Sequence, residues 1–202
     1  MVIIMKLILA SGSPRRREIL TNLGIPFEVV TCETDERCDL TDPAAYVREL
    51  AARKGVAVRE LLRGRGADLR DTLILAADTV VAQDSTILGK PADRADAVRM
   101  LTELAGREHA VYSGIALLRG EEIAAVAERT AVYVSPLTAQ EIARYVATGE
   151  CDDKAGSYAM QGLFSPYIRG IEGCYFNVVG LPVHALFQLA KDKFDIDLYS
   201  LV

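Results

Sequence analysis

Residues 2–24 read VIIMKLILASGSPRRREILTNLG, and this stretch decides the fold class. Val2 to Ala10 is an apolar run that is too short and too β-branched at its start for a helix, so it predicts a buried strand, central in a sheet. Ser13 and Pro14 then supply a helix cap and a first-turn proline, and Gly24 ends the helix that follows. A strand, a tight loop and a helix in direct succession are typical of α/β proteins.

The remaining sequence continues this alternation. Further strands are predicted at 27–30, 72–81, 86–88, 108–118 and 123–134, and further helices at 43–63, 95–104, 138–147 and 182–194. The strands at 108–118 and 123–134 form a long hairpin, and the glycine-rich segment 156–180 is interpreted as packing turns. Because the sequence contains no repeat or linker, residues 1–202 are expected to form one α/β domain around a mixed sheet, and this domain could be divided into two lobes.

Composition and charge exclude several classes of protein. Half of the residues are hydrophobic and a quarter are charged, which is typical of globular chains and excludes disordered or collagen-like ones. The net charge of -5 argues against binding long nucleic acid as the main task. The N-terminal apolar run is about half of the ~20 residues that a membrane span needs. A secretory signal has positive charge before its apolar run, whereas here the arginines come after it, so a cytoplasmic protein is expected. The four cysteines form no CxxC pair and are expected to be free thiols without a zinc site.

The loop that leaves the first strand is a candidate anion site. Ser11 to Arg17 places backbone N–H groups, hydroxyls and three arginines at the start of a helix. Cations in the first turn face the positive end of the helix dipole, at a cost of ~0.3–1 kcal/mol each unless an anion lies nearby. The alternative is a solvated helix start, but three successive arginines favour a phosphate site.

Asp78 is the one carboxylate in the apolar run 72–81, and we expect it at the carboxyl end of its strand, where α/β sheets form clefts. It is a candidate to position a metal or activate water, although a capping aspartate is the simpler interpretation. Asp35 and Glu36 lie in an acidic loop and offer further oxygen ligands for Mg²⁺ or Mn²⁺, or are merely solvated. Lys90 lies in a restricted Gly-Lys-Pro turn that suits a fixed cation. Gln161 has a donor and an acceptor for a base edge.

Three common catalytic motifs are missing from the sequence. It contains no GxxxxGK[ST] segment, no GxGxxG after a strand and no GxSxG elbow. A P-loop, a Rossmann dinucleotide site and a serine hydrolase elbow are therefore not supported.

Six ordered motifs together resemble the Maf family of nucleoside triphosphate pyrophosphatases, nearly from end to end. They are LASGSPRR (9–16), AADTVV (76–81), LGKP (88–91), DKAG (153–156), YAMQG (158–162) and NVVGLP (177–182). The resemblance implies an elongated mixed β-sheet flanked by helices, with two lobes around a deep cleft, as in inosine triphosphate pyrophosphatases. It also implies hydrolysis of a nucleoside triphosphate to a monophosphate and pyrophosphate with a divalent cation.

The resemblance also assigns roles to residues of this sequence. Asp78 matches the family's general base, and the polar cleft positions fall on Ser11, Arg15, Arg16, Glu36, Lys54 and Lys90. A metal bound through Asp78 and Glu36 would stabilise the charge that develops in the reaction. Arg15, Thr79 and Gln161 match specificity positions of the branch that cleaves dTTP and UTP, with modified pyrimidine nucleotides as further candidates. Two departures, Gly55 after Lys54 and the segment 164–166, are expected to alter loop shape near the base pocket.

Two other functions stay open at this point. The sister branch resembles 7-methyl-GTP pyrophosphatases, and a non-catalytic nucleotide-binding regulator of septum formation would need the same arginine loop. A sensor would bind the nucleotide and leave it intact, whereas an enzyme would release pyrophosphate only with a divalent ion. The resemblance further implies a homodimer.

Overall fold

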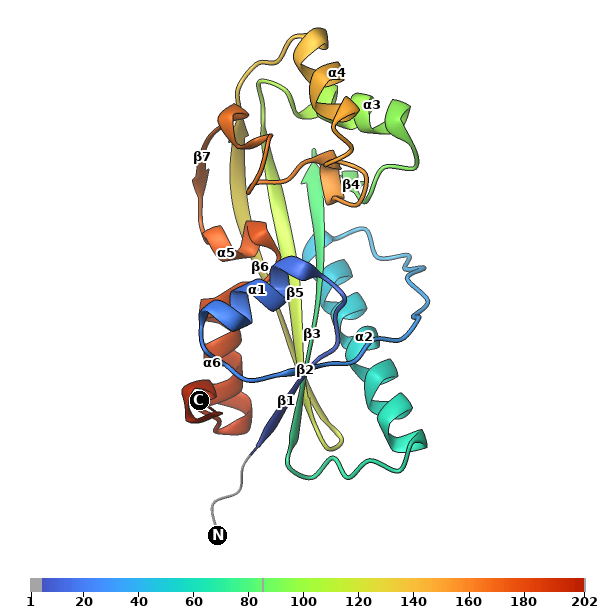
Figure 1. The fold of residues 1–202 in the computed structure, drawn as a ribbon, viewed down its shortest axis with the longest axis vertical. Helices are drawn as coiled ribbons and strands as arrows, with labels where there is room; N and C mark the ends of the chain where they lie inside the picture. The colour runs from blue at the N-terminus through green and yellow to red at the C-terminus, as the bar shows by residue number, and fades with distance from the viewer. Residues whose placement is uncertain (1–4, 85, 202) are drawn as a thin grey trace.

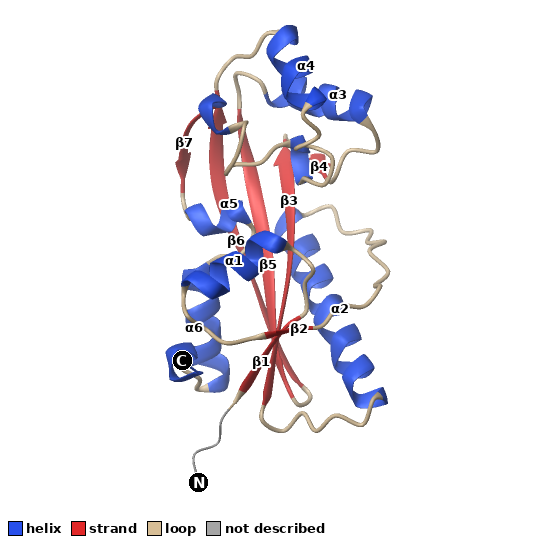
Figure 2. Cartoon of the chain, in the orientation of Figure 1, coloured by secondary structure: helices blue, strands red, loops and turns tan. Residues whose placement is uncertain are grey.

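The predicted strands assemble into a mixed sheet with helices on both faces (Figures 1 and 2), which confirms the predicted fold class. The computed structural model describes residues 5–84 and 86–201. Within these residues the sheet has seven strands in the order β2-β1-β3-β5-β6-β7, with β4 beside β3. The strands are β1 Lys6–Leu9, β2 Glu28–Val29, β3 Thr72–Gln83, β4 Thr86–Leu88, β5 Glu108–Arg119, β6 Glu122–Val134 and β7 Ile168–Glu172.

All helices except α5 lie close to their predicted positions. They are α1 Pro14–Asn22, α2 Pro43–Gly64, α3 Arg94–Leu104, α4 Ala139–Ala147, α5 Tyr175–Val179 and α6 Val183–Phe194, with short 3-10 turns at Ala155–Ser157, Ser165–Tyr167 and Leu198–Leu201. The chain leaves β1 into α1 with Ser13 as N-cap and Pro14 in the first turn, as predicted. None of the helices described is long and apolar enough to cross a membrane.

The prediction that the first strand is central was wrong, because β1 lies second from the edge, between β2 and β3. Within the predicted run, the strand β1 is four residues long. Residues 2–4 lie outside the described part of the chain. The centre of the sheet is instead formed by β3 and β5, which pair antiparallel from Ile74 to Ala82. These two long strands connect the two ends of the molecule (Figure 1).

The other side of β3 carries a gap in strand pairing. β1 pairs with its first part in parallel, from Thr72 to Leu75, and β4 pairs with its last part antiparallel, from Val81 to Gln83. Among the described residues, no strand pairs with 76–80 on this side. The sheet therefore has an open edge in the middle of β3, an almost entirely buried strand.

Three hydrophobic clusters surround this gap. Two lie on opposite faces of the β1–β3–β5 end, one under α1 and α6 and one under α2. The third lies at the other end and includes α3, α4 and the aromatic side chain of Phe164. The arrangement gives the expected elongated molecule with a lobe at each end of the hairpin β5–β6 (Figure 2).

Two elements in the glycine-rich segment were not predicted. β7 pairs with the outer edge of β6, and α5 packs against β5 and β6. Residues 168–172 contain two charged residues and a glycine, so they have little strand character of their own. Their structure depends on contacts with β6, which the local sequence does not encode.

Candidate active site

A cavity of about 530 Å³ lies at the gap beside β3, between the two lobes. This volume falls within the range of roughly 300–1,000 Å³ that is usual for small-molecule sites. All nine residues predicted for the site line it: Ser11, Arg15, Arg16, Glu36, Lys54, Asp78, Thr79, Lys90 and Gln161. The structure thus gathers residues from α1, α2, β3 and four loops around one cavity.

Asp78 lies in the middle of β3, so its predicted position at the carboxyl end of the strand was wrong. β3 continues to Gln83 because it pairs with β5 and, past the gap, with β4. The strand that does end at the cavity is β1, whose following residue, Ala10, donates its N–H to the carbonyl of Leu75 at 2.7 Å. The rule that clefts form beyond strand ends therefore holds for β1.

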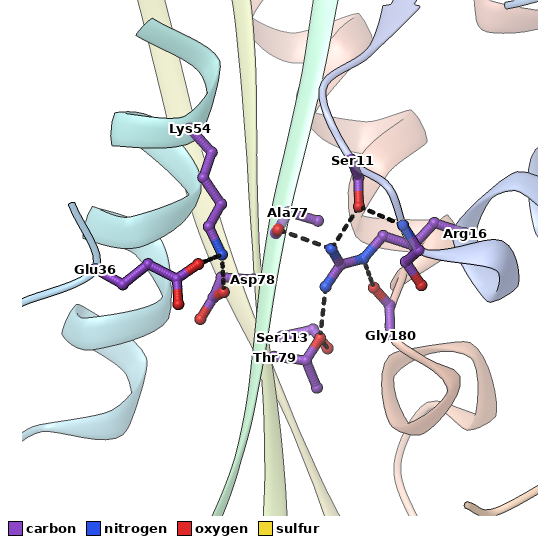
Figure 3. A network of polar contacts seen from close by, with 10 residues as sticks. Ser11, Arg16, Glu36, Lys54, Ala77, Asp78, Thr79, Ser113 and Gly180 are labelled. Atoms are coloured by element: carbon purple, nitrogen blue, oxygen red, sulfur yellow. Dashed lines mark hydrogen bonds and ion pairs between the residues drawn. The ribbon is translucent and has the colours of Figure 1, made fainter. Parts of the chain in front are cut away.

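Side-chain alternation along β3 divides the site into two halves. Asp78 shares its face of the sheet with Ile74 and Ala76, which pack in the cluster under α2. Thr79 faces the opposite side, toward α1 and the turn that follows α5 (Figure 3). The open edge lets both faces contribute to the same cavity.

On the α2 side, Lys54 joins two carboxylates. Its Nζ lies 2.7 Å from Asp78 Oδ1 and 2.7 Å from Glu36 Oε1. Lys54 and Asp78 are largely buried, whereas Glu36 approaches from the more exposed acidic loop (Figure 3). Helix periodicity positions the lysine, because Tyr46 and Leu50 line the cavity from the two preceding turns of α2.

The charges of this trio stabilise one another. Burial alone would lower the pKa of Lys54, but Asp78 and Glu36 outweigh burial and the pKa is raised. The hydrogen bond from Lys54 lowers the pKa of Glu36 in turn. Lys54 therefore stays a cation and Glu36 an anion at neutral pH.

On the opposite side, the guanidinium of Arg16 binds protein acceptors. Nε donates to the Gly180 carbonyl at 2.8 Å, Nη1 to Ser11 Oγ and the Ala77 carbonyl at 2.9 Å each, and Nη2 to Thr79 Oγ1 at 3.1 Å (Figure 3). Burial lowers the pKa of Arg16 to about 10, although Asp78 acts against the shift. Four of its five N–H groups are thus committed, which leaves one for a ligand. Arg16 fixes the open edge of β3 to α1 and to the turn after α5.

Arg15, Lys90 and Gln161 have more freedom to contact a ligand. No carboxylate of the described residues forms an ion pair with Arg15 or Lys90, in contrast to the paired Lys54 and Lys154. Gln161 is exposed and donates from Nε2 to the hydroxyl of Tyr175 at 2.9 Å, which leaves its carbonyl oxygen for other partners. The cavity therefore has two available cations and one available amide.

The carboxylates of Glu36 and Asp78 fit a divalent cation that arrives with a phosphorylated ligand. Both carboxylates accept from the same lysine nitrogen, so they converge on one part of the cavity and are the residues that would hold such an ion. The described residues contain no group of three or more His, Cys, Asp or Glu side chains arranged to hold a metal. Mg²⁺ is commonly bound through one or two carboxylates together with substrate phosphates, and this donor set has that composition.

A family profile described as "Maf-like protein" matches residues 6–193. The chain belongs to the Maf family.

Curated Maf relatives are similar over almost the whole chain. A protein of Caldanaerobacter subterraneus subsp. tengcongensis is 45% identical over 194 residues, which are 95% of this chain and 91% of the relative. A protein of Symbiobacterium thermophilum is 49% identical over 91% of this chain and 92% of the relative. A protein of Bacillus anthracis is 43% identical over 95% and 97%. Each of the three is named dTTP/UTP pyrophosphatase.

Sequence reasoning missed several residues of this Maf site. Tyr46 lines the cavity, and the spacing of four residues from Leu50 and Lys54 was the available signal. Asp153 and Lys154 line it as an ion pair. Ser113, which hydrogen-bonds Thr79, was not a candidate because a serine within a predicted strand carries no local signal of its role.

Proposed function

We propose that the protein hydrolyses dTTP and UTP between the α and β phosphates, releasing the nucleoside monophosphate and pyrophosphate. The observation that carries the proposal is the assembly of Asp78, Lys54 and Glu36 together with Arg15 and Lys90 around one cavity at the open edge of β3. Relatives that are 43–49% identical and named dTTP/UTP pyrophosphatase support the choice of substrate.

The cations of the cavity would bind the triphosphate. Arg15 and Lys90 are available for phosphate oxygens, and the remaining N–H of Arg16 adds a fixed donor. Ser11 accepts from Arg16 Nη1 at 2.9 Å, so its own hydroxyl proton remains for a phosphate oxygen. Neutralising the phosphate charge allows a water molecule to approach phosphorus.

Asp78 would orient the attacking water and accept its proton. One carboxylate oxygen accepts from Lys54, and within the described chain the other oxygen has no hydrogen-bond donor. Lys54 thereby fixes the direction of the carboxylate and leaves one oxygen for water. A base held by a second side chain in this way is pre-organised for proton transfer.

We also propose a divalent cation, Mg²⁺ or Mn²⁺, held by Glu36 and Asp78 together with phosphate oxygens. When bound, the ion neutralises phosphate charge and stabilises the charge that develops on the leaving group. Removing the ion with a chelator is expected to abolish pyrophosphate release, and adding Mg²⁺ or Mn²⁺ is expected to restore it.

One assay tests the proposed function as a whole. The purified protein is incubated with dTTP, UTP, CTP and 7-methyl-GTP in the presence of Mn²⁺, and the products are weighed by mass spectrometry. Monophosphate and pyrophosphate from dTTP and UTP are the expected products. Preference for 7-methyl-GTP would move the protein to the sister branch, and binding without turnover would favour a nucleotide-sensing regulator.

The setting of the reaction follows from the same proposal. Nucleoside triphosphates are cytoplasmic substrates, so we place the enzyme in the cytoplasm, and the family resemblance favours a homodimer. Sedimentation of the purified protein would test the dimer. A contribution to septum formation would have to act through the nucleotide pool or through a separate contact.

A further inference from the structure

The hydroxyl of Thr79 belongs to a hydrogen-bond chain whose direction is fixed by the donors present. Ser113 Oγ lies 2.9 Å from the backbone carbonyl of Asn177, which can only accept, so the single serine proton is used there. Thr79 Oγ1 lies 2.8 Å from Ser113 Oγ and must therefore be the donor of that pair. The chain runs in one direction, from Arg16 through Thr79 and Ser113 to Asn177.

This direction determines what Thr79 can offer to a ligand. Its proton is committed to Ser113, and one of its lone pairs accepts from Arg16 Nη2 at 3.1 Å. One lone pair remains, and Thr79 lines the cavity. Toward a bound molecule the threonine is consequently an acceptor only.

Buried contacts hold the end of the chain in place. Ser113 and Asn177 are fully buried, and the Asn177 amide donates to the Val111 carbonyl at 3.0 Å and to Thr130 Oγ1 at 2.9 Å. Thr130 also accepts from the backbone N–H of Cys174 at 3.0 Å. The Asn177 carbonyl also accepts from the backbone N–H of Gly180 at 3.0 Å, so its position is fixed. Reversing the hydrogen-bond chain would oppose the lone pairs of Ser113 Oγ and the Asn177 carbonyl at 2.9 Å inside the protein.

We propose that Ser113 is a positioning residue that sets the hydrogen-bond polarity of Thr79 and so makes the site select a base with a ring N–H donor. This inference rests on the proposed pyrimidine triphosphatase function. Uracil and thymine have a donor at N3, whereas cytosine has an acceptor there. An acceptor-only threonine pairs with the first two and faces cytosine with two opposed lone pairs.

The wild-type protein gives the first test, because it needs no substitution. Values of kcat/KM are measured for UTP, CTP and N3-methyl-UTP, which keeps the shape of uracil but lacks the N3 donor. UTP is expected to exceed both others by about tenfold or more, the effect of one hydrogen bond gained or one opposed pair avoided. Equal turnover of UTP and N3-methyl-UTP would overturn the inference, and absence of all turnover would overturn the proposed function as well.

The second test uses substitutions in the protein. Ser113→Ala removes the acceptor of the Thr79 proton, so the hydroxyl becomes free to rotate and donate to N3 of cytosine. The UTP-to-CTP ratio of kcat/KM is expected to fall about tenfold. In a Thr79→Val background, Ser113→Ala is expected to leave the ratio unchanged, because the serine acts only through Thr79.

Thr130→Val provides the matched control. It removes a fully buried hydroxyl that also binds Asn177 but has no hydrogen bond with Thr79. The control is expected to lower stability and keep the UTP-to-CTP ratio of the wild type. If Ser113→Ala lowers turnover of UTP and CTP in parallel, or if Thr130→Val shifts the ratio equally, the serine is merely structural and the inference fails.

Discussion

At the scale of single residues, Asp78 is the group on which the proposed chemistry depends most. Asp78→Asn keeps the size of the side chain and an oxygen that can accept from Lys54, while Lys54 retains its ion pair with Glu36. The variant is expected to fold with a melting curve close to that of the wild type. It loses the base, so pyrophosphate release should fall by about 10²–10⁴-fold.

The control for this substitution is Asp68→Asn, which removes an exposed carboxylate paired with Arg70, away from the cavity. Turnover at the wild-type rate is expected there. Full activity of Asp78→Asn would remove the aspartate from the mechanism, and a collapsed melting curve would assign it a structural role instead.

Residue identity could be predicted from sequence more readily than residue role. Asp78 could be identified because a carboxylate is unfavourable in a buried apolar strand unless it faces a polar site, and the structure places it at the cavity. Arg16 and Thr79 were predicted to contact the substrate directly, yet most of their hydrogen bonds go to protein atoms. The partners of a side chain come from distant segments, such as Gly180 for Arg16, so the local sequence does not show which hydrogen bonds remain for a ligand.

At the scale of elements, Gly55 determines how closely α2 approaches the sheet. The departure at Gly55 was expected to alter a loop, but Gly55 lies inside α2 and against β5. A Cβ at this position would lie 2.3 Å from Leu118 Cδ1 and 3.4 Å from Ala76 Cβ. Because Lys54 is the preceding residue, this contact also sets the distance of Lys54 from Asp78.

Gly55→Ala is therefore expected to destabilise the protein by about 1–3 kcal/mol through overpacking against Leu118, despite the better helix propensity of alanine. Leu118→Val in the same chain removes the clashing carbon and should recover part of the loss, which urea denaturation would measure. Gly64→Ala is the control, because nothing lies within 4 Å of its added Cβ. A stabilised Gly55→Ala protein would mean that the helix shifts freely and that Leu118 does not constrain it.

Elements with local signals were predicted well, and those without such signals were missed. The helix predicted at 138–147 is present as α4, and its start is fixed by a capping box of Thr138 and Glu141, whose partners both lie within one turn. α5 was missed because its anchors are Thr130 on β6 and Ser113 on β5, both remote in sequence. Phe164, in the segment 164–166 that was expected to alter loop shape near the base pocket, is fully buried among aromatic side chains, where it contributes to the core of its lobe.

At the scale of the whole molecule, the position of the site follows from the lengths of strands. The gap beside β3 exists because β1 pairs no further than Leu75 and β4 begins its pairing at Val81. The sequence indicated each of these strands but not their register, and register alone places Asp78 at the gap. The lobes are joined by β3, β5 and β6, so a disturbance in one lobe is expected to affect the stability of the entire chain.

His109 on β5 allows a test of this coupling. Its Nε2 lies 2.7 Å from the hydroxyl of Tyr158, and burial lowers the pKa of His109 from 6.5 to about 4. The unfolded chain therefore binds a proton at a higher pH than the folded chain does. The contribution of neutral His109 to the free energy of unfolding is complete above pH 6.5 and is lost as the pH falls toward 4. Between pH 7 and 5 the wild type should lose about 2 kcal/mol of unfolding free energy from this one group.

His109→Gln removes the titration and keeps a polar side chain for Tyr158. Its unfolding free energy, measured by urea denaturation at pH 7 and pH 5, is expected to change by about 2 kcal/mol less than that of the wild type. His184→Gln is the control, because His184 is exposed on α6 and is the only other histidine of the sequence. Equal pH dependence of the wild type and His109→Gln would show that the lobe with α3 and α4 opens and His109 is protonated without unfolding of the rest of the chain. Two separate unfolding transitions would confirm that the lobes are independent.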